Sequence, residues 1–165
     1  MTYADTPAVR LTRLTQPPLG DYLPMLKKRL GIDFDDHNDL LEGAIAAAVG
    51  KVETFTRHLL SQCQVQVSYG PGLIDAEIPF GPIIAPPDDL PVGATLTDEP
   101  FATLQYANSS ALTVLTYKAG YSGPALVPAQ FKTAVVILAA ELSGFGEPGN
   151  WKALVVEFRR ATWAD

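Results

Sequence analysis

Residues 35–60 read DDHNDLLEGAIAAAVGKVETFTRHLL, and this stretch decides the fold. Apolar residues recur in it at steps of four and three, so they line one face of a helix. They are Leu41, Ile45, Ala48, Val52, Phe55 and Leu59. Asp35 or Asp36 supplies the N-cap, and Asp39 adds negative charge to the first turn, where the helix dipole favours it. We therefore predict one long amphipathic helix, roughly 36 Å in length at 1.5 Å per residue.

A stripe of small residues follows the same predicted helix. It consists of Gly43, Ala47, Gly50 and Thr54, at spacings of four, three and four. A glycine inside a helix costs on the order of 1 kcal/mol relative to alanine. That cost indicates that another backbone comes close to the helix along this stripe. Two partners fit the pattern: another helix of the same chain, or a neighbouring subunit.

The composition fits one globular domain. A chain of 165 residues is long enough to bury a sizeable core. It is 47% hydrophobic and 18% charged, without an apolar run of transmembrane length. The first 18 residues lack the apolar segment of a secretory signal. The single cysteine, Cys63, excludes an intrachain disulfide and fits a reducing cytosol.

The negative charge gathers in the centre of the chain. No lysine or arginine lies between His58 and Tyr117, whereas the acids of this segment are Asp75, Glu77, Asp88, Asp89, Asp98 and Glu99. Half of the prolines lie between Pro71 and Pro100. The net charge of −6 argues against a protein that coats nucleic acid by neutralising phosphates. We interpret the central segment as an insertion with its own chemistry.

Apolar and polar residues alternate within this central segment, which is the pattern of β-strands. Cys63, Val65, Val67 and Tyr69 alternate with polar residues, as in a half-buried strand. Further short strands are predicted around residues 73–80, 83–84, 94–96, 102–106 and 112–117, with turns at the prolines and glycines between them. The sequence therefore predicts a small antiparallel β lobe over about residues 62–121.

The rest of the chain is predicted to be helical, apart from an extended arm over residues 1–18. A short helix begins at Asp21, tolerates Pro24 in its first turn, and ends at Gly31. A third main helix begins near Pro128 and presents Phe131, Val135, Leu138 and Leu142 to the core. We predict an α+β fold: a small helical bundle over about residues 19–61 and 127–146, the inserted antiparallel β lobe, and a helical or extended tail over about residues 150–165.

Residue types that often carry catalysis have structural explanations in this sequence. The densest carboxylate cluster consists of Asp33, Asp35, Asp36 and Asp39. It lacks the glycine and glutamate that an EF-hand loop requires, so helix capping explains it better. His37 and His58 lack metal-ligand spacing, and Cys63 lies in the strand pattern as a small apolar residue. No nucleophile elbow, phosphate loop or dinucleotide fingerprint occurs. We therefore predict no enzymatic activity, no metal and no cofactor.

The last fifteen residues combine aromatic and arginine side chains, which are enriched in interface hot spots. The residues concerned are Trp151, Leu154, Val155, Phe158, Arg159, Arg160 and Trp163. One alternative is a terminal helix that folds back on its own core. The other, which we prefer slightly, is a segment that docks into a partner, because Pro148-Gly149-Asn150 provides a hinge.

The order of these parts resembles the head–tail connector (adaptor, or head completion) proteins of long-tailed bacteriophages and gene transfer agents. The family pairs a short helix with a long acid-capped one, which here are LGDYLPMLKKRLGI and DDHNDLLEGAIAAAVGKVETFT. The long helix of the family closes with V-E-x-x-T-G-R-x-L, and this chain has Arg57 in place of that glycine and His58 in place of that arginine. The segments IPFGPI (residues 78–83), YKAGY (117–121), VPA (127–129) and LVVEFR (154–159) resemble later family motifs. LSGFGEPG replaces the usual tyrosine and arginine ending of the third helix.

The resemblance, which covers most of residues 19–160, implies a structural virion protein. Family members form an oligomeric ring, commonly twelvefold, between the portal and the tail or neck. The ring extends the DNA channel and provides a docking platform for tail attachment. The partners implied are copies of the same chain, the portal protein, the next neck or tail protein, and DNA that passes through without specific binding. A membrane is not among them. Assembly in the bacterial host cytoplasm and localisation in the virion at the head–tail interface follow.

The resemblance also gives the candidate surfaces their roles. The aromatic and arginine residues of the tail become candidates for portal binding, and the small-residue stripe becomes a candidate subunit interface. The candidate acidic surface, facing the lumen or the tail, consists of Asp88, Asp89, Asp98 and Glu99. Its charge, repeated around a ring, would repel the phosphates of passing DNA. Alternatives are a tail-terminator or other neck or tail protein, and a non-viral β-rich protein-binding module.

Overall fold

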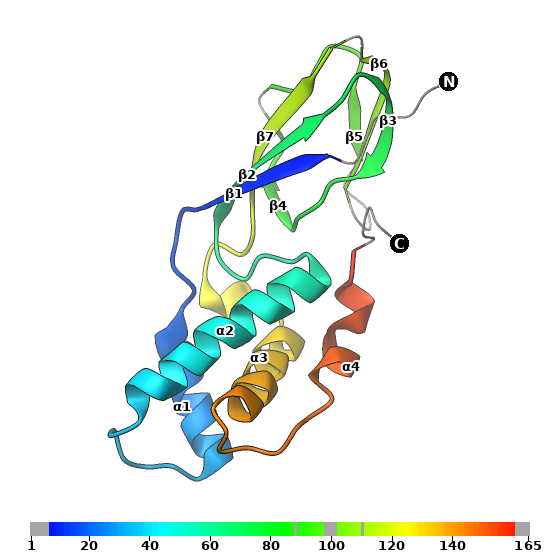
Figure 1. The fold of residues 1–165 in the computed structure, drawn as a ribbon. Helices are drawn as coiled ribbons and strands as arrows, with labels where there is room; N and C mark the ends of the chain where they lie inside the picture. The colour runs from blue at the N-terminus through cyan, green and yellow to red at the C-terminus, as the bar shows by residue number, and fades with distance from the viewer. Residues whose placement is uncertain (1–6, 88, 98–101, 110, 161–165) are drawn as a thin grey trace.

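The helical and the alternating parts of the sequence form two lobes stacked along the length of the molecule (Figure 1). A computed structural model describes residues 7–87, 89–97, 102–109 and 111–160. The helical lobe contains α1 (Leu19–Leu30), α2 (Asn38–Thr56), α3 (Ala129–Leu142) and α4 (Trp151–Val155), with short 3-10 turns η1 (Pro124–Leu126) and η2 (Val156–Phe158). The β lobe contains β1 (Ala8–Arg13), β2 (Cys63–Tyr69), β3 (Gly72–Glu77), β4 (Ile83–Ala85), β5 (Thr95–Thr97), β6 (Thr103–Ser109) and β7 (Thr113–Ala119). The predicted α+β class is confirmed.

The long helix α2 is shorter at both ends than the sequence predicted. His37 occupies the N-cap position without a capping hydrogen bond, so neither Asp35 nor Asp36 caps the helix. The Asp35 carboxylate instead accepts hydrogen bonds from Lys27 Nζ (2.6 Å) and Asn38 Nδ2 (3.1 Å), which ties the start of α2 to α1. At the other end Arg57 adopts the left-handed conformation (φ 59°) and donates its backbone N–H to the Glu53 carbonyl. The helix therefore ends with the geometry that usually favours glycine.

The helical lobe has its own apolar core. The predicted face of α2 is buried at Leu41, Ile45, Ala48 and Val52. It packs against α3 through residues that include Phe131, Val135 and Leu138, and Tyr22 and Leu26 of α1 complete the cluster. Leu142, expected in the core, lies at the end of α3 and is 37% exposed.

Helix α1 begins earlier than expected. Its first residue is Leu19 rather than Asp21, which places Pro24 beyond the first turn. Pro24 is exposed, so its ring faces solvent and not the core. The end of α1 is as predicted: Gly31 is left-handed (φ 67°) and donates its N–H to the Lys27 carbonyl. The three basic residues that precede it, Lys27, Lys28 and Arg29, complement the negative end of the helix dipole.

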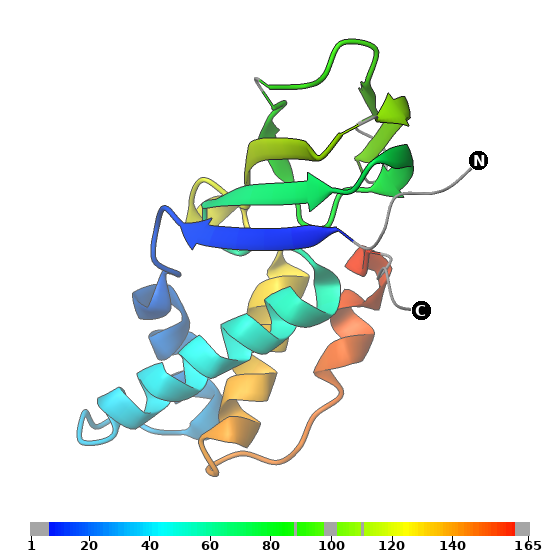
Figure 2. The ribbon, with the colours of Figure 1, turned by 45° about the horizontal axis from the view of Figure 1, so that its top comes forward.

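The β lobe consists of two antiparallel sheets with the strand orders β1-β2-β7-β4 and β3-β6-β5. The alternation in β2 is confirmed, since Cys63, Val65, Val67 and Tyr69 are all buried. They contact Ile74, Leu104 and Leu115 in a second core, separate from that of the helices. The N-terminal arm is part of this lobe, because β1 pairs with β2 from Ala8–Ser68 to Arg13–Cys63. Figure 2 shows β1 along the outer edge of its sheet, above α2.

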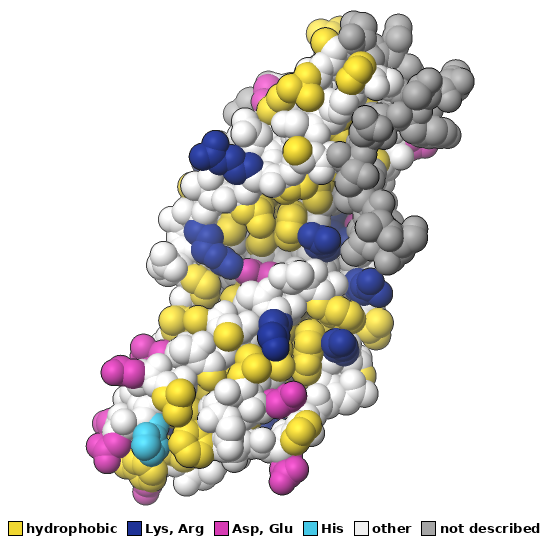
Figure 3. All heavy atoms as spheres, viewed as in Figure 1, with side chains coloured by type: hydrophobic (Ala, Val, Ile, Leu, Met, Phe, Trp, Pro, Cys, Tyr) yellow, Lys and Arg dark blue, Asp and Glu magenta, His cyan; other side chains and the backbone are white. Residues whose placement is uncertain are grey.

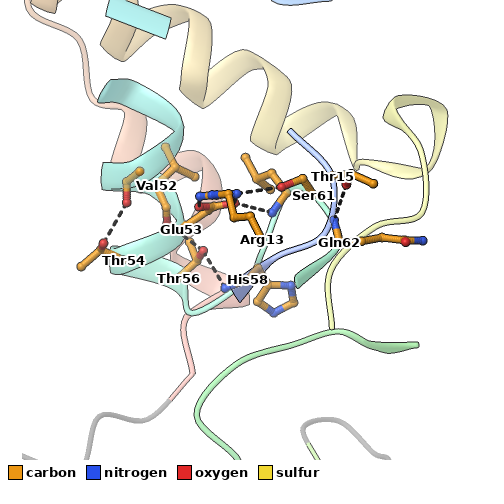
Figure 4. A network of polar contacts seen from close by, with 11 residues as sticks. Arg13, Thr15, Val52, Glu53, Thr54, Thr56, His58, Ser61 and Gln62 are labelled. Carbon is orange, nitrogen blue, oxygen red and sulfur yellow. Dashed lines mark hydrogen bonds and ion pairs between the residues drawn. The ribbon is translucent and has the colours of Figure 1, made fainter. Parts of the chain in front are cut away.

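A buried carboxylate joins the two lobes. Glu53, near the end of α2, is 4% exposed and forms an ion pair with Arg13 at the end of β1. Its Oε1 also accepts a hydrogen bond from the backbone N–H of Leu60 (2.8 Å), and Arg13 Nη1 donates to Ser61 Oγ (2.7 Å). Figure 4 shows the side chains of Arg13, Glu53 and Ser61 converging where the chain passes from α2 into β2. The glutamate of the connector-like motif therefore fixes the helical lobe to the β lobe.

We expect Glu53→Ala to lower the free energy of unfolding by about 2–3 kcal/mol, as measured by urea denaturation. Removing one partner of a buried pair typically costs more than this, but the Arg13 side chain is 36% exposed, so water screens part of the interaction. Arg10→Ala is the matched control: it removes an exposed arginine from the same strand and should change stability by less than about 0.5 kcal/mol. Equal stabilities for the two variants would contradict this assignment.

Candidate interaction surfaces

The groups considered for chemistry lie apart from one another. In the described ranges, no three His, Cys, Asp or Glu residues are placed to hold a metal ion. His58 is buried against the rings of Phe131 (5.5 Å) and Phe158 (6.0 Å), and burial together with nearby Arg160 lowers its pKa to about 4. Cys63 is buried in the β core, and burial raises the pKa of its thiol. Both side chains are therefore core groups, and the buried thiol lacks the exposure of a reactive cysteine.

The small-residue stripe lies on the solvent-accessible side of α2. Gly43, Ala47 and Thr54 are exposed, and Gly50 is half-buried. A Cβ atom built on Gly43 or Gly50 would have no atom of another described part of the chain within 4 Å. Of the two alternatives from the sequence, close packing against a helix of the same chain is therefore wrong at the two glycines. The stripe is a surface that is free in the single subunit.

Three residues of this stripe line a groove between α2, α3 and α4. The groove has a volume of about 700 Å³. Its lining consists of Ala47, Gly50, Lys51, Thr54, Phe55, Leu138, Glu141, Trp151 and Lys152. The floor is apolar and the edges carry charged groups. On the face drawn in Figure 3, yellow apolar surface over α2 and α4 is flanked by dark blue lysine and arginine side chains. Sequence periodicity predicted the stripe. It could not predict the groove, because the groove forms only where α4 packs beside α2 and α3.

Aromatic rings and cations organise the wall of this groove. Phe55 and Trp151 meet edge to face with their ring centroids 5.4 Å apart. Lys152 Nζ lies 5.6 Å from the Phe55 centroid and 5.8 Å from that of Trp151, while the Arg159 guanidinium lies 5.3 Å from Phe55. Such cation–π contacts hold the long basic side chains over the rings. The wall is therefore both apolar and positively charged.

The described part of the tail, residues 151–160, folds back on its own subunit. Val155 and Arg160 are buried, and Trp151, Leu154 and Phe158 pack against the helical core. The expected hinge is itself anchored, because a Cβ on Gly149 would collide with the Ile137 side chain and Asn150 Oδ1 accepts a hydrogen bond from the Ala153 N–H. The structure thus adopts the alternative that we preferred less. Trp163 lies outside the described residues.

Arg160 fixes the end of this segment to the junction between the lobes. Its backbone N–H donates to the Thr56 carbonyl (3.2 Å), and its guanidinium lies against Gly81 at a distance of 3.8 Å from the Glu77 carboxylate. A side chain at position 81 would collide with the guanidinium. Arg160 is therefore part of the internal structure in the single chain, and Arg159 next to it is exposed.

The candidate acidic surface is described only at Asp89. This residue is exposed, and its Oδ1 accepts a hydrogen bond from the backbone N–H of Thr116 in β7 (3.3 Å). Asp88, Asp98 and Glu99 lie outside the described residues. Asp75 on β3 is also exposed, whereas Glu77 is close to Arg160. The acids of the β lobe therefore divide between its surface and its internal contacts.

We expect Gly43→Ala and Gly50→Ala each to raise the free energy of unfolding by up to about 1 kcal/mol, since alanine is the better helix former and its methyl group has open space here. Gly149→Ala is the control and should destabilise, because the added methyl group would collide with Ile137. Chemical denaturation of the free subunit measures all three. Destabilisation by the α2 variants would mean that the stripe is packed within the chain.

Comparisons with known proteins agree with this architecture. Residues 21–87 match the model of the phage gp6-like head-tail connector protein family. No curated protein matches the sequence. Within the part of the chain that the structure describes, no helix is long and apolar enough to cross a membrane.

Solved structures extend the likeness to nearly the whole chain. A chain from the virion of a native gene transfer agent (GTA) particle superposes with a TM-score of 0.70 at 17% identity, covering 92% of this chain and 96% of that one. A chain from the neck of an empty GTA particle, computed with C6 symmetry, gives 0.67 at 15% identity and covers 93% and 96%. A chain from the neck of a native GTA particle, computed with C12 symmetry, gives 0.64 at 18% identity with the same coverage. The family match over residues 21–87 and the fold shared with these chains agree with the resemblance to head–tail connector proteins that the sequence indicated.

Proposed function

We propose that this chain is a structural head–tail connector protein that assembles into a ring, twelvefold in symmetry, between the portal and the tail or neck of a virion. The ring extends the channel through which DNA passes and gives the next neck or tail protein a platform on which to dock. Subunits are made in the cytoplasm of a bacterial host and act in the finished particle. The function needs no catalysis, cofactor, membrane or specific binding of DNA.

The symmetry of the similar particles supports the ring. Chains with this fold occur in GTA necks computed with C6 and C12 symmetry. A closed ring with rotational symmetry uses heterologous contacts, in which two different surfaces of each subunit meet. A connector subunit therefore needs at least two interaction surfaces on opposite sides.

The observation that carries the proposal is the free small-residue stripe on α2. Its two glycines reduce helix stability in the single subunit, yet among the described residues no other part of the chain comes within 4 Å of a Cβ atom built on either glycine. Small residues along a helix allow the backbone of another molecule to come close. We therefore assign Gly43, Ala47, Gly50 and Thr54 to the interface between neighbouring subunits of the ring.

The tail remains our candidate for portal binding. Its buried residues and its exposed residues have different roles in this proposal. Val155 and Arg160 are buried and hold the segment on its own subunit, so they position the others. Arg159 is exposed beside the rings of Phe55 and Trp151, and Trp163 follows four residues later. We propose that the portal contacts Arg159, Trp163 and the outward sides of Trp151, Leu154 and Phe158. For the acidic surface, we propose that Asp88, Asp89, Asp98 and Glu99 face the lumen or the tail and keep DNA from adhering.

Ala47→Trp should reduce ring assembly at least tenfold while the subunit stays folded, because a bulky ring then fills the exposed stripe. Light scattering and negative-stain microscopy, on the protein alone and with portal, give the mass and symmetry of the assemblies. Val92→Trp is the matched control, since Val92 is 99% exposed in the β lobe. A wild-type protein that forms no ring in either condition would refute the proposed function, and unchanged assembly of Ala47→Trp would refute the stripe as interface.

Portal binding is tested with changes that leave the core intact. Deleting residues 161–165 together with Arg159→Ala should weaken portal binding at least tenfold, with the unfolding midpoint within a few degrees of wild type. Deleting residues 151–165 should instead destabilise the protein, because it removes Val155 and Trp151 from the helical core. Calorimetry of portal titrations and thermal unfolding measure the two effects. Portal binding that survives the first change would exclude the end of the tail as the contact.

A further inference from the structure

The charged residues at the groove between α2, α3 and α4 are mostly basic. Lys51 and Lys152 belong to its lining, and Arg159 lies over Phe55 at its wall. Glu141 is the acidic member of the lining. An occupant that places carboxylates beside the lysines and apolar side chains on the floor would match this surface in both respects.

A second feature of the same chain has the complementary chemistry. Residues 33–42, which we call the acidic tip, lead from α1 into α2 and contain Asp33, Asp35, Asp36, Asp39 and Glu42. Asp35 is bound by Lys27, whereas Asp33, Asp36 and Asp39 are exposed. Figure 3 shows the acidic side chains of this region gathered around a histidine at one end of the helical lobe. The basic residues nearest in sequence, Lys28 and Arg29, belong to the end of α1.

The acidic tip also presents apolar surface in a fixed form. Phe34 is 48% exposed and Leu40 is 52% exposed. The Phe34 ring meets the His37 ring at 5.6 Å, and His37 lies 5.4 Å from Phe145, which follows α3. This short stack holds the loop against the end of α3. The tip is therefore an ordered apolar projection with carboxylates around it.

The tip of a chain cannot fill the groove of that same chain. The rise along α2 from Asn38 to Gly50 is about 18 Å, since each helical residue adds 1.5 Å. The tip lies at the N-terminal end of α2, and α4, which borders the groove, lies at the opposite side of the helical lobe (Figure 1). A heterologous contact joins two different surfaces of neighbouring copies, and the tip of one subunit and the groove of the next are two such surfaces.

We propose that the groove of one subunit receives the acidic tip of the next copy, so that Lys51 and Lys152 face Asp33 and Asp36 while Phe34 lies toward Phe55 and Trp151. The inference rests on the proposed ring and specifies which two surfaces close it. The contact is electrostatic at its edge, so salt weakens it. It also explains why helix α2 keeps small residues along the groove: the loop of the neighbour comes close to its backbone.

A mixture of two single-cysteine variants tests this pairing. Asp36→Cys and Gly50→Cys lie too far apart to form a disulfide within one chain, and each variant alone offers only like positions to its neighbour. Under mild oxidation, the mixture should give at least tenfold more cross-linked dimer than either variant alone. The control mixture of Asp36→Cys with Val92→Cys should give none above background, because Val92 lies in the β lobe. Cys63 is 1% exposed and takes no part.

Charge reversal gives an independent readout. Lys51→Glu with Lys152→Glu should weaken association at least tenfold, as should Asp33→Lys with Asp36→Lys. An equal mixture of the two proteins should recover association to within threefold of wild type, because each junction then pairs opposite charges. If the wild-type protein forms rings but the cysteine mixture gives no cross-link and the charge-reversed mixture shows no rescue, the pairing of groove and tip is wrong. The proposed ring would then still hold. Cross-linked dimers without any ring would support the pairing and refute the ring.

Discussion

The buried carboxylate of Glu53 is the constraint on which the arrangement of the two lobes depends. It lies in the last turn of α2, and it binds the end of β1 through Arg13 and the start of the crossover through the Leu60 N–H. A buried carboxylate without partners would be unfavourable by several kcal/mol, so these three segments stay together. The helical core and the β core are separate clusters. The contacts of Glu53 therefore help to fix the orientation of the helical lobe relative to the β lobe.

The backbone on the other side of the junction reinforces that arrangement. The Leu59 N–H donates to the Gly81 carbonyl (2.8 Å), and the Gly81 N–H donates to the Arg57 carbonyl (3.0 Å), so the residues after α2 are held by the strand region before β4. Gly120 is needed where β7 leaves the sheet: its φ is 104°, and a side chain there would collide with the Ser61 carbonyl. The segments that resemble family motifs therefore meet at one place, where the chain crosses between the lobes three times. Motif residues of this protein therefore hold the junction between the lobes together.

The sequence predicted the elements in which apolar residues recur at a regular spacing. It missed the features that depend on tertiary contacts. The α2 face at Leu41, Ile45 and Val52 and the alternation of β2 follow from periodicity, and both are buried as expected. The N-cap was wrong because Lys27, on another helix, binds Asp35. The pairing of β1 with β2 joins residues fifty to sixty positions apart, which no local pattern indicates. The stripe was visible in the sequence, whereas the groove was not, because its second wall is α4, and the place of α4 depends on burial of Val155.

The folded position of the tail affects the entropic cost of the proposed portal contact. If α4 were free before docking, its ordering would cost conformational entropy, which a partner would have to offset. In the folded subunit, Val155 and Arg160 have already ordered the segment, so Trp151 and Arg159 are presented in place. The same packing builds the wall of the groove beside α2. One helix of five residues, α4, therefore forms part of both candidate surfaces. If the portal binds as proposed, a shift of α4 on binding would also alter the contact between subunits. Under the proposed function, α4 would therefore couple the portal contact to the contact between subunits.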